Sequence, residues 1–515
     1  MNSRQYGYLL LSLWVGMTAF VPSSPFSREV SSPSQSKIDI QDVQCGGEIG
    51  RRIDMTIEKN IQSIDIDKDF LLPFQEKNRS DGYIGLGKFI DSLVRLSAHT
   101  RSETLIALKD RVIGELLKTQ EADGYMGISR PDRRMWALWD IHEMNYLANG
   151  LTSDFLYFHS QKSLDAAIRL MNYLMTRWQE KPDGLDRCGI TVFMAVTGLE
   201  ETLLMMHKAT GDPRYLDFCV QFRQLPEWDS PIVRGRYLPI EGHAYAYLHR
   251  CLAQLRLYRI QPDPTLLLKT RGVLDFLTEG DGLTINGVCS QDECWHDTQD
   301  GTEGLGETCA TAYLIRVLDE LIRMESNSLG DSLYGDMMER SIFNGLFAAQ
   351  SPDGRHLRYY VPFEGQREYF DGDTYCCPCN YRRIVAELPG MIYYPKKNGV
   401  IINLYTPSDT QFPLSDPENG GTLKIRQETD YPNSGEVTIS VYPSKPTRCS
   451  IALRIPRWCK QAQIEINGIP LTESCSGGTF YPIEREWQAG DKIVLHMPMP
   501  WRWIQGRKAQ SGRVA

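Results

Sequence analysis

The sequence lacks any block of positive charge. Its 56 Lys and Arg residues and 65 Asp and Glu residues give a formal net charge of −9, and both signs are spread along the chain. Nucleic-acid-binding domains cluster Lys and Arg on one face, so this distribution argues against a nucleic-acid partner. Small molecules or neutral polymers fit the composition better.

Long apolar runs are also absent, apart from one short stretch near the N-terminus. Residues 8–20 (YLLLSLWVGMTAF) form an apolar run that follows Arg4 and precedes small residues. A membrane-spanning helix needs about 20 apolar residues, whereas the core of a secretory signal needs about 7–15. We therefore expect residues 1–27 to be a signal peptide, with the mature protein periplasmic or extracellular and not stably inserted in a membrane. A lipid-facing anchor or a buried N-terminal helix is the alternative.

Cysteine is too scarce for a disulfide scaffold. The chain has 13 cysteines among 515 residues, far below the roughly 8–10% that marks such scaffolds. The odd count leaves at least one thiol unpaired, so some of these cysteines need another explanation. The length itself allows about three domains and a large buried core.

Residues from about 80 to 394 show helical periodicity. Gly and Asp-Gly pairs separate the periodic segments, and Pro or Asp starts the next one. Apolar residues recur at three- and four-residue spacing in segments 89–99, 102–120, 163–179, 199–209, 244–260 and 265–277. Repeated helical hairpins can close into a ring of inner and outer helices around a cleft. We therefore predict an (α/α)6 barrel domain over residues 28–397, although a fold alone proves no chemistry.

After about Gly399 the period changes to that of strands. Short alternating runs, bounded by Gly, Pro and Asn, occupy 399–407, 421–432, 435–444, 449–459, 462–471, 478–487 and 491–500. This pattern is typical of an antiparallel sandwich. We predict an all-β sandwich domain over residues 398–515, and we expect it to be incomplete because SGRVA at the end of the sequence reads as the start of another strand.

Two short motifs contain metal-ligating side chains. Glu307 and Cys309 lie in GETCATAYL, and Cys376, Cys377 and Cys379 lie in YCCPCN. Thiolates and a carboxylate make a plausible ligand set for Zn²⁺. Adjacent cysteines do not readily bridge to each other, so one sulfur can hold a metal while its neighbour faces a substrate. Buried structural cysteines, a Cys-x-x-Cys redox motif or half of a structural zinc site are the alternatives.

Several motifs in the same order resemble glycoside hydrolase family 127, the β-L-arabinofuranosidase family. Upstream of CCPCN these are ADGYMG, IHEMNYLANG, EGHAYA and GETCA, and downstream they are ALRIPRW, IEINGIPL and WQAGDKIVLHMPMPWRW. The resemblance runs from about Asn78 to the C-terminus. It implies a zinc-dependent retaining exo-glycosidase that removes terminal β-L-arabinofuranose, or a related sugar, from an oligosaccharide or polysaccharide.

The resemblance also implies a metal site and a nucleophile. Zinc would be held by Glu307, Cys309, Cys376 and Cys377, and Cys376 would attack the sugar. A zinc ion that favours the thiolate would supply a reactive sulfur where a second carboxylate normally stands. Cys379 departs from the family pattern, which has a second proline there.

The acid/base implied by the resemblance is Glu293 in QDECWHD. Its spacing to Glu307 is 14 residues, shorter than in the family, which leaves Asp292 and Glu303 as rivals. A protonated carboxyl at this place would donate to the leaving oxygen and then deprotonate the water that releases the sugar.

Substrate contacts follow from the same motifs. His142 in IHEMNY and His243 in EGHAYA match pocket histidines of the family, and Tyr359 matches a pocket tyrosine. Trp295, next to the acid/base, is expected to stack on a sugar face. Val196 stands where the family has a further pocket histidine, so a different sugar, acidic or branched, is the alternative substrate.

The charge of the expected metal site needs an offset. Three thiolates and one carboxylate around Zn²⁺ leave an excess of negative charge that is costly to bury. We hypothesise that Arg382 or Arg383, on a helix capped by Asn380, supplies the opposite charge. The alternative is that both arginines point to solvent or pair with Glu387.

Two further functions remain open on the sequence alone. One is a zinc-free (α/α)6 lyase or uronyl hydrolase that uses a carboxylate with His142 or His243. The other is a non-catalytic glycan-binding protein in which the metal is structural. The composition also permits an oligomer.

Overall fold

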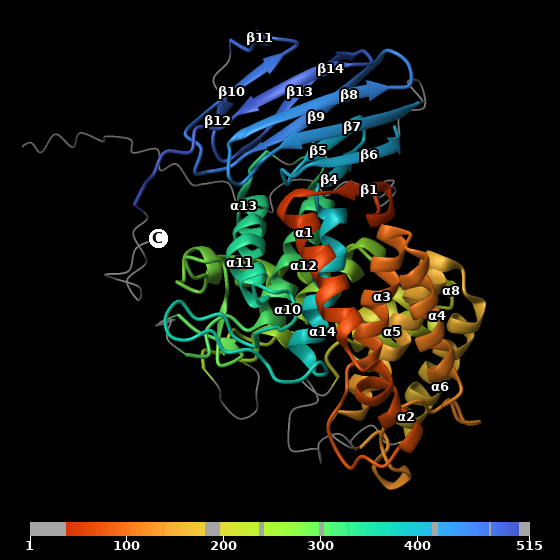
Figure 1. Ribbon diagram of the computed structural model, residues 1–515. Coiled ribbons are helices and arrows are strands. Elements are labelled where there is room, and N and C mark those ends of the chain that lie inside the picture. The colour runs from red at the N-terminus through yellow and green to blue at the C-terminus, as the bar shows by residue number, and fades with distance from the viewer. Residues whose placement is uncertain are drawn as a thin grey trace, which may run out of the picture.

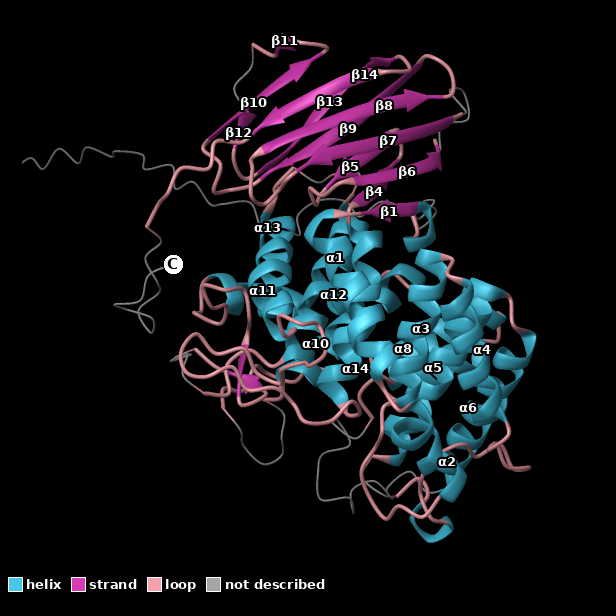
Figure 2. Cartoon of the chain, in the orientation of Figure 1, coloured by secondary structure: helices cyan, strands magenta, loops and turns pink. Residues whose placement is uncertain are grey.

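The computed structural model describes residues 38–136, 139–180, 196–235, 242–297, 303–326, 328, 330–414, 421–472 and 475–503. The expected signal peptide and the last residues of the sequence lie outside this range. In the described residues, helices fill one end of the molecule and β-sheets stack on the other (Figures 1 and 2). The predicted order, a mainly helical part followed by an all-β part, is confirmed.

The helical part is built around a closed ring. The α-helices are α1 (Gly47–Met55), α2 (Leu72–Glu76), α3 (Leu86–Thr100), α4 (Glu103–Leu117), α5 (Asp140–Phe158), α6 (Gln161–Glu180), α8 (Leu199–Thr210), α9 (Pro213–Asp217), α10 (Ala244–Ile260), α11 (Leu268–Thr278), α12 (Thr308–Glu325), α13 (Leu333–Arg340) and α14 (Cys376–Glu387). Helices α3, α5, α8, α10, α12 and α14 each contact the next, and α14 contacts α3 again. Helices α4, α6, α9, α11 and α13 pack outside this ring. This is the inner and outer arrangement of an (α/α)6 barrel.

Burial distinguishes the inner helices from the outer ones. The outer helix α4 buries one stripe, which includes Leu105, Val112 and Leu116, as an amphipathic helix does. The inner helix α5 is buried on every side from Asp140 to Asp154. The inner ends of the ring helices therefore place polar side chains in the interior of the protein, where they need partners.

The β part consists of two larger sheets. The strands are β1 (Val43–Cys45), β4 (Tyr393–Lys396), β5 (Gly399–Ile402), β6 (Ser408–Pro413), β7 (Thr422–Thr429), β8 (Glu436–Pro443), β9 (Thr447–Ile455), β10 (Gln461–Ile466), β11 (Ile469–Pro470), β12 (Cys475–Ser476), β13 (Thr479–Trp487) and β14 (Asp491–His496). One sheet has the order β1-β6-β7-β8-β14-β10-β11, with β12 on β10, and the other has the order β13-β9-β5-β4. Alternate residues of β10 are buried, as in a half-buried strand.

The two parts of the chain are interleaved. Strand β1, which precedes the described α-helices, pairs antiparallel with β6, and Figure 1 shows this early segment beside the later strands. A small separate hairpin, β2 (Ser290–Gln291) and β3 (Cys294–Trp295), lies within the helical part. Among the described residues, no helix combines the length and the apolar character needed to span a membrane.

Candidate active site

Two helix N-termini bring the sequence-predicted ligands together. Glu307 is the N-cap residue of α12 and Cys309 lies in its first turn, while Cys376 and Cys377 begin α14. Helices α12 and α14 pack against each other in the ring. The N-terminus of a helix carries unpaired N–H groups and a partial positive charge, so it favours carboxylate and thiolate groups. Four residues from two distant motifs thus form one buried cluster, which we call the cysteine cluster.

The distances within the cysteine cluster suit a tetrahedral metal ion. The four ligand atoms all lie within 4.8 Å of one another. Cys376 Sγ is 3.9 Å from Cys377 Sγ, which is 3.7 Å from Glu307 Oε1 and 3.2 Å from Cys309 Sγ. Zinc–sulfur bonds of about 2.3 Å and a zinc–oxygen bond of about 2.0 Å give separations of about 3.8 Å between sulfurs and about 3.5 Å between sulfur and oxygen. Two of the three separations match closely, and the third is shorter than the ideal but well beyond a disulfide bond.

The protein alone does not stabilise four negative charges in this place. Burial, and for Glu307 also the nearby charge of Glu293, raises the pKa of Glu307 well above its ordinary value. Burial likewise raises the pKa of Cys309 and of Cys377. The second oxygen of Glu307, Oε2, is buried and has no hydrogen-bond partner among the described residues. A divalent cation would both satisfy this oxygen and favour the deprotonated ligands.

Cys376 behaves differently from its neighbours. Burial opposes its ionisation, but hydrogen bonds from Cys309 and Cys377 and the charge of Lys88 together hold the pKa of Cys376 well below its ordinary value. Its sulfur also lies 3.6 Å from the hydroxyl oxygen of Tyr359. Cys376 therefore belongs to the cysteine cluster on one side and to a second group of polar residues on the other.

Glu293 belongs to that second group. It occupies the turn between β2 and β3, where Asp292 and Glu293 both have positive φ, at 48° and 67°, as the central residues of a type I′ turn do. The hydroxyl of Tyr359 donates a hydrogen bond of 2.5 Å to Glu293 Oε1. A glutamate held at positive φ is uncommon, and such conformations concentrate at functional sites.

The structure separates Glu293 from its two rivals. Asp292 lies beside Gly304, which accepts a hydrogen bond from the Asp292 N–H, and its carboxylate would clash with a side chain at that glycine. Glu303 is exposed, and its carbonyl oxygen is 3.4 Å from the amide of Gln291. Of the three carboxylates, Glu293 is the one that Tyr359 links to Cys376.

The two predicted pocket histidines lie around the same centre. Both ring nitrogens of His142 are buried without a hydrogen-bond partner among the described residues, and its ring packs 4.6 Å from that of Tyr83. Burial and the charge of Lys88 hold the pKa of His142 well below its ordinary value, so the ring is neutral. His243 caps α10, and its Nδ1 accepts from the Ala246 N–H. This bond uses the lone pair of Nδ1, so the ring hydrogen lies on Nε2, 3.7 Å from Glu293 Oε2.

A second group of residues could also hold a metal ion, and the tautomer of His243 decides against it. His243, Glu293 and Glu307 also offer three atoms within 4.8 Å of one another. Because the capping bond leaves the hydrogen on Nε2, this nitrogen acts as a donor toward Glu293 and offers no lone pair to a metal. The cysteine cluster is thus the better candidate for a metal site.

The prediction that Trp295 stacks on a sugar is wrong. Its side chain is fully buried, with its ring edge-on to those of Tyr247 and Phe276. It supports the β2–β3 hairpin from the core and presents no free ring face. Sequence reasoning missed Tyr83, whose ring stacks on that of Tyr375 at 4.9 Å between centroids.

The arginines that follow the cysteines do not supply the opposite charge. Arg382 is buried and donates to Asn60 and to the carbonyl of Asp373, and Arg383 is buried in an ion pair with Asp91. Neither reaches solvent, and Glu387 pairs with Arg316 instead. The helix begins at Cys376, so Asn380 lies within it and does not cap it.

Lys88 is the buried cation that sequence reasoning missed. It lies in the first turn of α3, is fully buried, and its Nζ lies 4.3, 5.4 and 5.6 Å from the ring centroids of Tyr146, Tyr245 and Tyr83. Nζ also donates a hydrogen bond of 3.3 Å to the Tyr245 hydroxyl. Burial lowers the pKa of Lys88, whereas negative charge on Cys309 and Cys376 raises it. A sequence signal did exist, because a lysine among apolar residues on an inner helix needs a specific partner.

Glu143 holds the start of α3 in place. Its carboxylate accepts hydrogen bonds of 2.5–3.1 Å from the N–H groups of Ile84, Gly85 and Leu86. The same segment contacts the start of α14, because the Tyr375 N–H donates a hydrogen bond to the Ile84 carbonyl. Gly85 allows this approach, because a Cβ there would lie 3.0 Å from Cys379 Sγ. Cys379 thus packs between the helices and takes no part in the cysteine cluster.

Comparisons with known proteins identify the family. Residues 58–390 match the family model of the beta-L-arabinofuranosidase GH127 catalytic domain, and residues 399–499 match that of the GH127 middle domain. The non-reducing end beta-L-arabinofuranosidase of Bifidobacterium longum subsp. longum is 22% identical in an alignment of 508 positions that covers 83% of this chain and 73% of that protein.

Solved structures share the fold. A GH127 beta-L-arabinofuranosidase from Geobacillus stearothermophilus T6 superposes with a TM-score of 0.73 at 23% identity, covering 91% of this chain and 83% of the other. A second GH127 beta-arabinofuranosidase gives a TM-score of 0.77 at 19% identity, covering 93% and 83%. The catalytic-domain match alone spans more than half of the sequence. The chain therefore belongs to glycoside hydrolase family 127, as its motifs predicted, and is a glycoside hydrolase.

Proposed function

We propose that the protein is an exported, zinc-dependent, retaining exo-glycosidase that removes terminal β-L-arabinofuranose or a related sugar from glycans. One observation carries the proposal: Cys376 lies within the cysteine cluster and also contacts Tyr359, which hydrogen-bonds to Glu293. A candidate nucleophile and a candidate acid thus share one site. In this proposal, residues 1–27 direct export, residues 28–397 form the catalytic domain and residues 398–515 form the sheet domain.

Glu307, Cys309, Cys376 and Cys377 would hold the zinc ion. Their burial, their separations and the unpartnered Glu307 Oε2 all fit a tetrahedral ion with three sulfur ligands and one oxygen ligand. When bound, zinc would favour the thiolate forms of the cysteines at neutral pH.

Cys376 would attack the anomeric carbon and form a glycosyl thioether. Glu293 would donate a proton to the leaving oxygen in this step and would deprotonate water in the second. The two distances to the Tyr359 hydroxyl place Cys376 Sγ and Glu293 Oε1 at most about 6 Å apart. Retaining glycosidases separate their two groups by about 5–5.5 Å, and inverting ones by about 6.5–9.5 Å. The short separation supports two displacements, which retain configuration.

His142, His243 and Tyr359 would orient the sugar. The two free nitrogens of His142 offer one donor and one acceptor to sugar hydroxyls. His243 Nε2–H and the Tyr359 hydroxyl both face Glu293, so they would hold its carboxyl group toward the leaving oxygen.

Lys88 would offset the excess negative charge of the metal site. Arg382 and Arg383 are already paired with other groups, as described above. The ammonium group of Lys88, held among three tyrosine rings, lowers the pKa of Cys376 by its charge. We infer that it stabilises the thiolate form of the cluster without touching the substrate.

The experiment that tests this function combines product stereochemistry with trapping. Hydrolysis of nitrophenyl glycosides, including the β-L-arabinofuranoside and acidic sugars, should release the preferred sugar with retained configuration, as seen by NMR. A Glu293→Gln variant should still react with an activated leaving group but release the sugar slowly, so a pentose should accumulate on the Cys376 peptide in mass spectrometry. The matched control is Glu303→Gln. An inverted product, or an adduct on another residue, would contradict the mechanism.

Val196 bears on the choice of sugar. It is fully buried in the core and offers no polar group to a substrate, where a histidine is expected from the family pattern. A preference for a different sugar in the nitrophenyl panel would keep the mechanism and change the substrate.

A further inference from the structure

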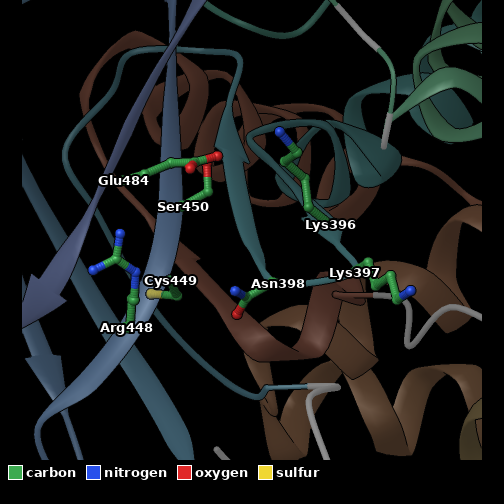
Figure 3. A pocket seen from close by; sticks show the side chains of 7 residues that line it. All are labelled: Lys396, Lys397, Asn398, Arg448, Cys449, Ser450 and Glu484. Atoms are coloured by element: carbon green, nitrogen blue, oxygen red, sulfur yellow. The ribbon is translucent and has the colours of Figure 1, made fainter.

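A cavity of about 420 Å³ lies in the β part of the protein, lined by none of the residues of the cysteine cluster (Figure 3). Its polar lining comes from Lys396, Lys397, Asn398, Arg448, Ser450 and Glu484. Its volume falls within the range of about 300–1,000 Å³ that is usual for small-molecule sites.

The register of the second sheet places part of this lining in one row. Glu484 of β13 pairs with Ser450 of β9, Ser450 pairs with Gly399 of β5, and Gly399 pairs with Lys396 of β4. Directly paired residues point to the same face of a sheet, so the side chains of Glu484, Ser450 and Lys396 lie on one face. Gly399 has φ at 140°, and a Cβ there would lie 1.8 Å from the Ser450 carbonyl oxygen. The backbone therefore requires glycine at this place in the row.

Positive charge predominates around the cavity. Lys396, Lys397 and Arg448 contribute three cations, and Glu484 contributes one carboxylate. Glu486, which pairs with Arg448 across β13 and β9, places a second carboxylate next to the lining. This excess stands out in a chain whose formal net charge is −9. Figure 3 shows Ser450 and Glu484 beside each other and the two lysines on the β4–β5 hairpin. An anionic ligand would fit this lining better than a neutral or cationic one.

Ser450 supplies an independent sign of a ligand. Its side chain is 6% exposed, and its hydroxyl has no hydrogen-bond partner among the described residues. Buried hydroxyl groups are nearly always paired, so an unpaired one in the wall of a cavity needs an explanation. The neighbouring amide of Asn398 adds a second polar group of the kind that binds sugar hydroxyls.

We propose that this cavity binds an anionic sugar unit, through its sulfate or carboxylate group, and anchors acidic glycan chains on the β part. Arginine and lysine recognise carboxylate and sulfate by charge-assisted hydrogen bonds, while the hydroxyl and amide bind the sugar itself. The binding is independent of the chemistry at Cys376, so it stands or falls separately from the proposed hydrolysis.

Titration calorimetry on the full chain tests the proposal. The Cys376→Ser variant serves as the background, so that no probe is consumed. The probes are trigalacturonate, a sulfated disaccharide and neutral galactotriose. We expect both anionic sugars to bind, with affinity that falls as salt rises, and the neutral one not to bind. Arg448→Gln and Lys396→Gln should each weaken binding about tenfold.

Matched variants test whether binding depends on the lining of this cavity or on the overall charge of the surface. Lys445→Gln removes an exposed lysine of the β part that does not line the cavity, and it should leave binding unchanged. Ser450→Ala should weaken binding by about threefold at low and high salt alike. Equal binding of galactotriose, or unchanged binding by the Lys396→Gln/Arg448→Gln double variant, would overturn the proposal. Inorganic sulfate that binds as tightly as the sulfated disaccharide would overturn its sugar part.

Discussion

Cys376 of the helical ring and Cys449 of the sheets are both buried but differ in their neighbours. Cys449 of β9 is 2% exposed, and burial alone raises its pKa to about 11. Cys376 is just as enclosed, yet it lies at a helix N-terminus beside two other thiols and within the field of Lys88, and its pKa is lowered. Burial by itself makes a thiol inert, and the arrangement of charges around it makes a thiol reactive.

Replacing one cysteine in each region should give the largest contrast. Cys376→Ser should lower kcat by about 10⁴-fold or more, because a serine hydroxyl in this place is neither a comparable nucleophile nor a zinc thiolate. Cys449→Ser should change kcat by less than about twofold. Steady-state rates on the preferred nitrophenyl glycoside, with circular dichroism to verify folding, measure both. Comparable losses in the two variants would remove the distinction between the regions.

Replacing Glu293, the proposed acid, should give the next largest loss of kcat. Glu293→Gln should lower kcat by about 10²–10⁴-fold on a substrate with a poor leaving group, because proton donation is lost. Asp292→Asn, in the same turn, should have a small effect, since its side chain faces Gly304. The comparison of alkyl and nitrophenyl glycosides reports on the proton transfer. A larger loss in Asp292→Asn would reassign the acid.

Metal removal should destabilise the helical ring locally and leave the sheets unchanged. At a zinc concentration a thousandfold above Kd, the bound ion stabilises the folded state by about 4 kcal/mol. Chelation should therefore lower the Tm of the protein, and added zinc should restore it. In hydrogen exchange, protection should fall in α12 and α14 and remain in β7 and β8, which hold no ligand. Equal loss of protection in all four elements, or none, would count against a local metal site.

Removing the positive charge of Lys88 should give the smallest of these effects, a loss of affinity for zinc. Lys88→Met should weaken zinc binding by about 10–100-fold, because the negative cluster loses the nearby positive charge. Lys492→Met, at an exposed position on β14, is the control. Competition with a fluorescent chelator measures the affinity, and the sulfur-to-cobalt absorption of the Co²⁺ form shows whether the thiolates still bind. Unchanged zinc affinity in Lys88→Met would contradict the proposed role of Lys88, because another group would then have to offset the negative charge of the cysteine cluster.

Local sequence patterns predicted much of the fold. The six periodic segments from 89–99 to 265–277 correspond to α3, α4, α6, α8, α10 and α11. The strands after Gly399 overlap the predicted alternating runs, except for β6 and β12, which lie in none of them. Helix α5 was not among the predicted segments, because its residues are buried on every side from Asp140 to Asp154 and its apolar stripe is weak. A helix buried all round shows weak amphipathic periodicity, so its pattern says less about its place in the ring.

The ligand motifs were visible in the sequence, whereas their surroundings were not. Glu307, Cys309, Cys376 and Cys377 stand in short, recognisable stretches, and the structure brings their side chains together. Contacts between distant segments determine three features that the sequence did not reveal. These are the place of Lys88, the core position of Trp295 and the pairing of β1 with β6. Local propensity does not encode such contacts, since tertiary packing selects them.

The central claim is that four side chains from two distant motifs hold one divalent ion and thereby make Cys376 reactive. X-ray absorption at the zinc edge of the purified protein tests it most directly. The proposed function predicts one zinc per chain with three sulfur neighbours at about 2.3 Å and one oxygen neighbour at about 2.0 Å. Protein that binds no zinc, or binds it through nitrogen and oxygen alone, would contradict the claim.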